Sequence, residues 1–560
     1  MKIKTIQRIF SIFSVTVLLY LLFSLTKGSN SIDESSFSEV NINKYYIIFL
    51  FIFNVAPILF YLSNKNEQEL IPLFYFINIF FLLFYTLPNL LIVSELLEPL
   101  LDKVYEDKLN INNTNKLLLV GFFTFNLGYF LFYKIIFIKR KGFEILNITR
   151  PNEIFYLSIL FIMIIVISFN IIEIQNLKSS FLMLKFPILY LALGLICYYL
   201  VNYYSKKNIF KVIILTTLYL FIIFQELLTG LLTFSFLLTS YFFIFSLFVK
   251  KKVNILLFFL IFFIMFTMQA YKDDYRKLIK YSQHNILYLD FNWGLKLIEN
   301  NFKTIKDVKN ASVEDLMSID GMTVNEAKNL IRLAKNFNFT PNFFQKSSFL
   351  FGRKAIIKTF IENPLNDLNS EENLLTKKYK VSTHRLLHSY ESLLVITKKT
   401  PIDVAFMKGD SYKYLIRGLV PGIFWKNKPQ DNISHEAGIR YGVLWIKDCC
   451  TSWNLPILSE MYMNFGTKGI VIGMFILGFL TRILTLIFSI KNKNNFEYII
   501  GFFCIIPLFY FETNASHLFG SFYKNYIFLM IMMLCYRYFL YNPFIALLKK
   551  LKKNLLIVKF

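Results

Sequence analysis

The sequence predicts an all-α polytopic membrane protein with about twelve transmembrane helices and one large, mainly helical exterior segment before the tenth helix. Three observations carry this prediction. Apolar residues make up 56% of the chain, which contains 65 phenylalanines and has a mean hydropathy of +0.50, more than a soluble core needs. Apolar runs of about 20 residues, enough to cross a hydrocarbon core of about 30 Å, recur along the chain. Lysine and arginine gather in alternate turns between these runs.

The apolar runs define the individual helices. In chain order they lie near residues 9–25, 45–62, 71–94, 117–138, 154–172, 180–204, 209–228, 230–249, 253–270, 468–490, 497–511 and 525–541. The first run resembles a secretory signal in length, but no small-residue cleavage pattern follows Leu25. We therefore expect it to be a retained helix.

The distribution of charge predicts the orientation, because short cytoplasmic loops collect lysine and arginine. With the N-terminus inside, every inner turn but the first is basic. The basic segments lie at residues 2–8, 139–150, 206–207, 250–252, 491–493 and 549–553, whereas the short outer loops are acidic or mixed. This alternation fits twelve helices with both termini in the cytoplasm. It divides the chain into helices one to nine (1–270), an exterior segment (271–467), and helices ten to twelve with a basic cytoplasmic tail (468–560).

The exterior segment is where we expect the chemistry. No inner loop is long enough for a nucleotide-binding domain, and the sequence contains no glycine-rich phosphate loop. ATP hydrolysis and the use of cytosolic nucleotide sugars are therefore not supported. A reaction on the exterior side must draw on a donor that is already in the membrane or the exterior space.

Arginines of the exterior segment indicate an anion site. Six of the eleven arginines lie there: Arg276, Arg332, Arg353, Arg385, Arg417 and Arg440. In a chain that otherwise favours lysine, this matters because the arginine fork can contact phosphate or carboxylate in a bidentate way. Any one of them can also be a solvated surface charge.

Two local patterns suggest other chemistry. His384, His388 and Glu391 would share one helical face, but the spacing is not HExxH and no further ligand is evident, so we expect neither metal nor cofactor. The stretch "NASVEDLMSIDGMTVNEAKNLIRLAK", within 300–336, resembles a helix-hairpin-helix with two capping boxes, Ser312 to Asp315 and Thr323 to Glu326. That motif often holds a nucleic-acid backbone, but its usual second glycine is replaced by Thr323. A small helical decoration is the simpler interpretation, and nucleic acid is not expected as a partner.

A membrane-interface segment is predicted at "SYKYLIRGLVPGIFWKNKP", residues 411–429. Its aromatic residues favour the interface and its cations can contact headgroup phosphates, while Pro421 and Pro429 break it into short pieces. It can lie flat on the outer leaflet beside a lipid-linked pyrophosphate. The alternative is a buried strand or helix of the exterior domain.

The same region carries a family resemblance. Its segments are "TP" at Thr400, "KGDSY" from Lys408, "LVPGIFWKNKP" from Leu419, "YG" at Tyr441, "TS" at Thr451, "SEMYMNFGTKG" from Ser459, and "YKDDYR" upstream with Lys272 and Arg276. Together, over residues 382–467, they resemble the O-antigen polymerases (Wzy-type oligosaccharide repeat-unit polymerases). One departure is Gly422, where the family often has arginine. The hairpin-like insert is not a known part of the family.

The resemblance implies a glycosyltransferase in the bacterial inner membrane. In the family's reaction a glycan on undecaprenyl pyrophosphate is transferred to a new lipid-linked repeat unit at the outer face, building surface polysaccharide such as O-antigen or capsule. The partners would be the lipid-linked donor and acceptor, membrane lipid and a chain-length regulator protein. No metal is required, but cations must stabilise the leaving group and a base can assist the acceptor hydroxyl.

The resemblance also suggests roles for individual residues. We expect Arg276, Arg385, Arg417, Lys428 and Arg440 to stabilise the leaving group, with Lys272 and Trp425 as further substrate-binding residues. Glu460 is the preferred base, with His384 and His435 in reserve. Glu460 could equally orient the turn at Asn464 to Gly466.

Three other functions stay open from the sequence. A lipid-linked glycan ligase uses the same donor with a different acceptor. A polysaccharide transporter or flippase is less favoured, because the helices carry few central charges and Lys134 and Lys185 are the clearest. An exterior polynucleotide-binding membrane protein is suggested only by the hairpin-like insert.

Overall fold

A computed structural model describes residues 43–63, 73–93, 107–132, 151–171, 178–203, 208–228, 242, 291–300, 302, 305–335, 374–415, 432–445, 452–488 and 511–541. These residues form helices and turns, with no strand among them. The chain divides into two compact units, each described here by itself. The first comprises 1–216, 245–253 and 384–560, and the second 217–244 and 254–383.

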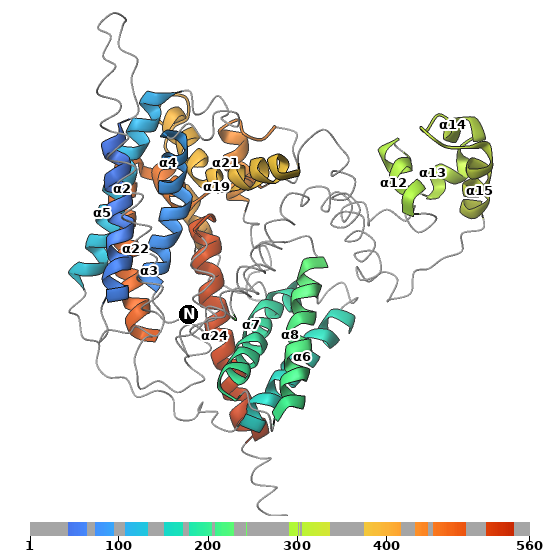
Figure 1. Cartoon of the computed structure of the whole chain (residues 1–560), viewed down its shortest axis with the longest axis horizontal. Helices are drawn as coiled ribbons and strands as arrows, with labels where there is room; N and C mark the ends of the chain where they lie inside the picture. Colours follow the sequence, from blue (N-terminus) through green and yellow to red (C-terminus); the bar gives the residue numbers. More distant parts are fainter. Residues whose placement is uncertain are drawn as a thin grey trace, which may run out of the picture. The chain divides into compact units, whose positions relative to one another are not determined.

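The helices of the two units are shown in Figure 1. The first unit contains α2 (Lys44–Ser63), α3 (Leu73–Phe81), η1 (Leu82–Thr86), α4 (Leu87–Val93), α5 (Lys108–Leu131), α6 (Pro151–Ile171), α7 (Lys178–Asn202), η8 (Asp410–Tyr412), α21 (Ile433–Arg440), α22 (Ile457–Phe488), α24 (Ala515–Cys535) and η10 (Tyr536–Tyr541). The second contains α12 (Phe291–Glu299), α13 (Ile305–Asn310), α14 (Val313–Met317) and α15 (Val324–Lys335). Two helices, α8 (Ile209–Leu228) and α19 (Leu374–Lys399), have residues in both.

Three of the described helical stretches are long and apolar enough to cross a membrane. They are Leu73–Ile92, Ile457–Leu486 and Ala515–Tyr538, and each overlaps a helix that the sequence predicts. The all-helical class and the presence of membrane-spanning candidates are thus confirmed for the described part of the chain. The predicted helices 9–25 and 253–270 lie outside the described residues, as do nearly all of 230–249 and 497–511.

Several helices begin earlier than hydropathy predicts. α5 begins at Lys108 rather than near 117, and α24 begins at Ala515 rather than near 525. Side-chain caps explain both extensions, because the Asp107 carboxylate accepts from the Asn110 N–H at 3.0 Å and the Asn514 Oδ1 accepts from the His517 N–H at 3.0 Å. Hydropathy reports the apolar part of a helix, whereas caps stabilise its polar first turns.

Close packing of α5 against α22 forms the centre of the first unit. A Cβ at Gly128 would lie 2.3 Å from the Phe475 carbonyl oxygen, and a Cβ at Gly478 would lie 2.1 Å from that of Phe125. Glycine is therefore needed at both positions for the two backbones to meet. Small residues at such crossings allow the close van der Waals contact that associates helices in membranes.

Contacts along these helices also show their relative directions. Phe53 and Phe60 of α2 contact Phe123 and Phe130 of α5 in the same order, so α2 and α5 are parallel. α3 runs the opposite way along α5, because Phe74 stacks on Tyr129 with 3.8 Å between ring centroids, whereas the later Phe81 stacks on the earlier Phe122 at 4.7 Å. These directions agree with the predicted alternation of helices two, three and four.

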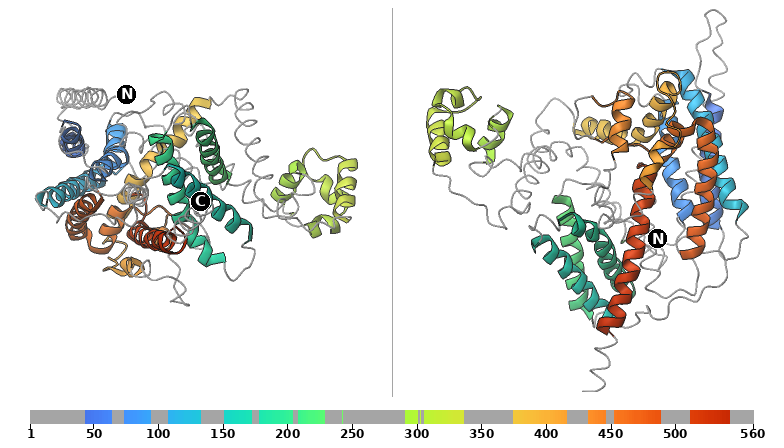
Figure 2. Two further views of the ribbon diagram at one scale, coloured as in Figure 1. Left: turned by 90° about the horizontal axis from the view of Figure 1, so that it is seen from below. Right: turned by 180° about the vertical axis from the view of Figure 1, so that it is seen from behind.

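Helices α12 to α15 of the second unit pack around a small core of their own, and Figure 2 shows them as one cluster. Both predicted capping boxes are present. Ser312 Oγ accepts from the Asp315 N–H at 3.0 Å while the Asp315 carboxylate accepts from the Ser312 N–H at 2.9 Å. The Thr323 N–H donates to Glu326 at 2.9 Å, and Gly321, with φ +79°, makes the turn between α14 and α15.

Candidate functional site at the start of α22

Helix α22 is broken near its beginning. Gly466 has φ 60° and ψ −143°, which separates a short part, Ile457–Phe465, from a long part, Thr467–Phe488. The long part is about 33 Å at 1.5 Å per residue, enough by itself to cross a hydrocarbon core. The short part turns back onto the long one, because a Cβ at Gly469 would lie 2.2 Å from the Met461 carbonyl oxygen. The predicted boundary at 467/468 therefore falls at a break inside a helix and not at its start.

The loop before η8 covers the end of the short helix. The N–H groups of Met407 and Lys408 donate to the carbonyls of Met463 and Asn464 at 3.0 and 3.1 Å. The Gly409 N–H donates to the Asn464 side-chain oxygen at 2.9 Å. Carbonyls at a helix end have no partner within the helix, so this loop satisfies groups that the break would otherwise leave without one.

Glu460 lies at the centre of a buried polar cluster. Ser411 Oγ donates to its Oε1 at 2.6 Å, and the Ala515 N–H donates to its Oε2 at 2.7 Å. Asn464 Nδ2 donates to Ser411 Oγ at 2.8 Å. Glu460 and Asn464 are 1% and 0% exposed. The carboxylate thus joins the broken helix, η8 and the first residue of α24. Its negative charge at the start of α24 also interacts favourably with the dipole of that helix.

This arrangement bears on the two roles expected for Glu460. Both of its oxygens are occupied by donors of the protein itself, which is the arrangement of a residue that orients its neighbours. The charge of the Glu460 carboxylate also affects Tyr412, the residue after Ser411. Burial, with the nearby Glu460 carboxylate as a second cause, raises the pKa of Tyr412, so its hydroxyl stays protonated.

Two further segments join the cluster from α19 and α21. Thr400, directly after α19, makes a 2.7 Å hydrogen bond with the hydroxyl of Tyr441, directly after α21. The Lys399 ammonium donates to the Tyr441 carbonyl. Arg440 donates to the carbonyl of Ala405 at 2.6 Å, two residues before Met407. The turn at 400–409 is therefore held from α21 on one side and from α22 on the other.

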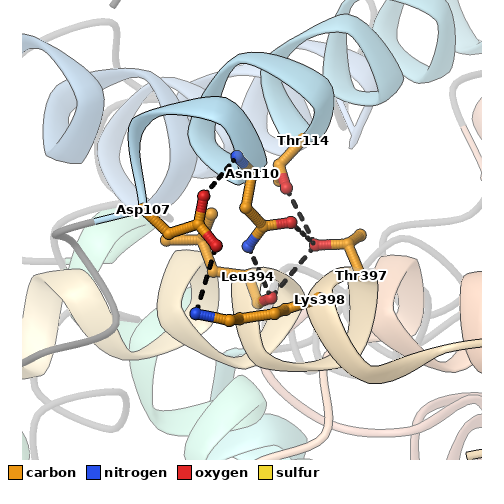
Figure 3. Close-up of polar contacts among 6 residues, drawn as sticks. All are labelled: Asp107, Asn110, Thr114, Leu394, Thr397 and Lys398. Atoms are coloured by element: carbon orange, nitrogen blue, oxygen red, sulfur yellow. Dashed lines mark hydrogen bonds and ion pairs between the residues drawn. The ribbon is translucent and has the colours of Figure 1, made fainter. Parts of the chain in front are cut away.

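The end of α19 is attached to the first turns of α5, as Figure 3 shows. Asn110 Nδ2 donates to the Leu394 carbonyl at 3.0 Å, and the hydroxyls of Thr114 and Thr397 are 2.8 Å apart. Lys398 lies 3.1 Å from the Asp107 carboxylate. The Asn110 backbone N–H, with help from Lys398, lowers the pKa of Asp107, so the cap stays charged. The polar cluster is thereby placed at the end of the bundle where α5 and α22 begin.

A groove of about 950 Å³ lies beside the cluster, between α22 and α24. Its wall is almost wholly apolar and includes Met461, Ile472, Leu480 and Phe519. At the end near the cluster it is lined by Lys408, Tyr412, Asn464 and Lys468. Glu460 itself is not among the described residues that line the groove. Asn464 and Ala515, which hydrogen bond to Glu460, line the groove and separate the carboxylate from it.

The predicted site residues fall into three groups. Glu460 and Arg440 meet through the 400–415 segment, and His435 lies on α21 with its side chain half-buried. The backbone of His384 and Arg385 belongs to α19, but their side chains lie outside the described residues. The remaining predicted residues, Lys272, Arg276, Arg417, Trp425 and Lys428, lie outside the described residues altogether.

The structure adds site residues that the sequence reasoning did not name. They are Lys408, Ser411, Tyr412, Asn464 and Lys468. All five belong to the quoted segments "KGDSY" and "NFGTKG", so the signal was present. Because lysine is common throughout this chain, Lys408 and Lys468 do not stand out in the sequence as phosphate ligands.

Comparison of the chain with protein-family models, with characterised proteins and with solved structures gave no match. The described fold and site define a helical protein with membrane-spanning candidates and a polar cluster beside an apolar groove.

Proposed function

We propose that this protein polymerises oligosaccharide repeat units carried on undecaprenyl pyrophosphate, at the outer face of a bacterial inner membrane. One observation carries the proposal. Four of the segments that resemble the repeat-unit polymerases are joined by hydrogen bonds. Thr400 bonds to Tyr441, the segment Lys408–Tyr412 bonds to the segment Ser459–Gly469, and the Tyr462 hydroxyl of that last segment donates to the Thr400 carbonyl at 3.5 Å. Segments up to about 60 residues apart in the chain have no local reason to interlock, so a shared site is a sufficient explanation of their pattern.

The surroundings of the cluster suit a lipid-linked substrate. A hydrocarbon chain could lie in the apolar groove along the part of α22 that can span a membrane. A charged headgroup could then bind at the polar end of the groove. In the proposed reaction the C1–O bond of the donor glycan breaks, the acceptor hydroxyl forms the new glycosidic bond, and lipid pyrophosphate leaves. Cations near the leaving oxygens stabilise the charge that develops on them.

Glu460 enters this scheme as a positioning residue. Its hydrogen bonds hold Ser411 and the first turn of α24, and through Ser411 and Asn464 they fix the loop that carries Lys408. Arg440 supports the same loop from the other side through Ala405. A base that acts directly on the acceptor hydroxyl remains a proposal, with His435 as a candidate on α21. His435 is not among the described residues that line this groove, so it would have to reach the acceptor from outside it.

The hairpin-like insert argues little for a nucleic-acid receptor. The backbone N–H of Thr323, at the start of α15, is bonded to the Glu326 carboxylate, and the Thr323 hydroxyl donates to the same group. These bonds lower the pKa of Glu326, which keeps a negative charge at the helix start. A phosphate would meet a carboxylate where the nucleic-acid motif offers N–H donors.

The glycan profile of a deletion strain tests the function. A polymerase predicts that surface glycan is still attached but carries a single repeat unit, and that plasmid-borne wild-type protein restores long chains. Loss of all attached glycan would instead indicate a ligase. A normal chain-length distribution would refute both.

A further inference from the structure

The groove between α22 and α24 has the geometry of a site for a hydrocarbon chain. It follows the broken helix from Met461 to Leu480, within the stretch Ile457–Leu486 that can cross a membrane. Ile472 and Ile476 on its wall are 59% and 48% exposed. Exposed isoleucines on a membrane helix face hydrocarbon at little cost, so the wall is suited to an apolar chain.

Charge is confined to one end of this groove. Lys408 and Lys468 are the charged residues among the described side chains that line it, and both are exposed. Asn464 and Tyr412 add polar groups at the same end. Two ammonium groups at one end of an apolar groove are complementary to a lipid with an anionic headgroup, and lysine binds phosphate well as a point charge.

The backbone at Lys408 is a second, independent observation. Its φ is +49°, in the left-handed region that glycine and asparagine adopt more readily than lysine. Hydrogen bonds from Met407, Lys408 and Gly409 to the end of the short helix hold it there. Strained residues of this kind cluster at ligand sites, where the strain positions a group for binding.

We propose that Lys408 and Lys468 bind the phosphate groups of a single-chain phosphorylated lipid whose hydrocarbon lies in this groove. The chain would run along α22 from Gly469 toward Leu480, about 16 Å. The proposal deepens the proposed function by naming two headgroup-binding residues, and it rests on that function for the identity of the natural lipid. Binding itself can be measured without any glycan transfer.

The test uses the full-length protein in nanodiscs of phosphatidylcholine. Isothermal titration with farnesyl diphosphate is compared with farnesol, which lacks the phosphates, and with inorganic diphosphate, which lacks the chain. The variants are Lys408→Asn, which removes the charge but tolerates the left-handed backbone, and Lys468→Gln. Lys413→Gln is the matched control, because Lys413 is also exposed and nearby but does not line the groove.

We expect each groove variant to weaken farnesyl diphosphate binding about ten-fold and the control to leave it unchanged. A further variant, Ile476→Trp, fills the groove away from the polar cluster and should weaken the lipid while leaving the melting temperature as in wild type. Equal binding of farnesol, or lysine-dependent binding of inorganic diphosphate as tight as that of the lipid, would overturn the proposal. So would unchanged affinity in both lysine variants. If the lysine variants lose farnesyl diphosphate binding but still restore long polymer in the deletion strain, the binding site stands and the proposed polymerase role of the site fails.

Discussion

Replacing Glu460 by Gln tests the buried cluster, because the two side chains have the same shape and differ in charge and in one acceptor. Glu460 accepts from Ser411 Oγ and from the Ala515 N–H at 2.6 and 2.7 Å. Gln can keep its oxygen toward Ala515, while its amide nitrogen must face Ser411, whose hydroxyl already accepts from Asn464. Both bonds lose their charge assistance, worth about 1 kcal/mol each, so we expect a loss of roughly 2 kcal/mol in unfolding free energy.

The assay is thermal unfolding of the purified protein in detergent, followed by intrinsic fluorescence and by gel filtration of heated samples. A loss of this size should lower the melting temperature by a few degrees. Glu436→Gln is the matched control, because this carboxylate is exposed and its contact with the Tyr414 hydroxyl is long, at 3.4 Å. Ser411→Ala should also destabilise, and the double variant with Glu460→Gln should cost less than the sum of the two, because they share one hydrogen bond.

The same variant separates the two roles of Glu460. A positioning residue predicts a lower melting temperature together with shorter, but not absent, polymer in a complemented deletion strain. A general base predicts near-total loss of polymer at wild-type stability. If Glu460→Gln melts like both the wild type and Glu436→Gln, the carboxylate does not hold the cluster together and the reasoning from its two hydrogen bonds is refuted.

Three further predictions follow from packing, capping and the insert. Gly478→Val places side-chain atoms where a Cβ alone would be 2.1 Å from the Phe125 carbonyl oxygen, so overpacking by at least about 1–3 kcal/mol should reduce the yield of monodisperse protein on gel filtration. Asp107→Asn should lower the melting temperature at pH 7 but not near pH 2. The Asn110 N–H and Lys398 lower the pKa of Asp107 below its usual 3.8. The charged carboxylate therefore stabilises the folded protein at neutral pH, and this stabilisation is lost as the pH falls through the lowered pKa. The isolated segment 291–335 should give a helical circular dichroism spectrum that melts cooperatively, because its helices bury a core of their own.

Each of these has a control and a contrary result. Ile472→Val changes an exposed position of the same helix and should leave the yield as in wild type, whereas a normal yield for Gly478→Val would contradict the close crossing of α5 and α22. A melting difference for Asp107→Asn that persists at pH 2 would show that its charge is not the cause. A coil spectrum for 291–335 would mean that its core depends on the rest of the chain.

Much of the architecture was predictable because it depends on local pattern. The apolar runs at 71–94, 468–490 and 525–541 identified three helices that can span a membrane, since a bilayer demands about 20 apolar residues in a row. The capping boxes at Ser312 and Thr323 were predictable for the same reason, because a cap and its partner are three residues apart.

The beginnings of the helices were less predictable, because they depend on polar residues that hydropathy scores as loop. α22 was expected to begin near 468, but the short helix Ile457–Phe465, which contains Ser459, Glu460 and Asn464, and a glycine break precede that point. Nothing in the pattern around Gly466 distinguishes a flexible turn from a fold-back of one helix on another. That distinction requires Met461 to pack against Gly469 and Gly473.

The sequence alone was enough to predict a helical protein whose helices are long and apolar enough to span a membrane, and to single out Glu460 and the segments around it as a candidate site. The contacts of Glu460 could be known only from the folded structure, because its partners Ser411 and Ala515 lie about 50 residues away on either side in the sequence. It also placed Lys408 and Lys468 at one end of an apolar groove. A one-dimensional pattern records which residues are polar or apolar, but it does not record which distant residues satisfy a buried charge. Tertiary packing sets which residues are partners, since a buried carboxylate is stable only where donors from other segments reach it.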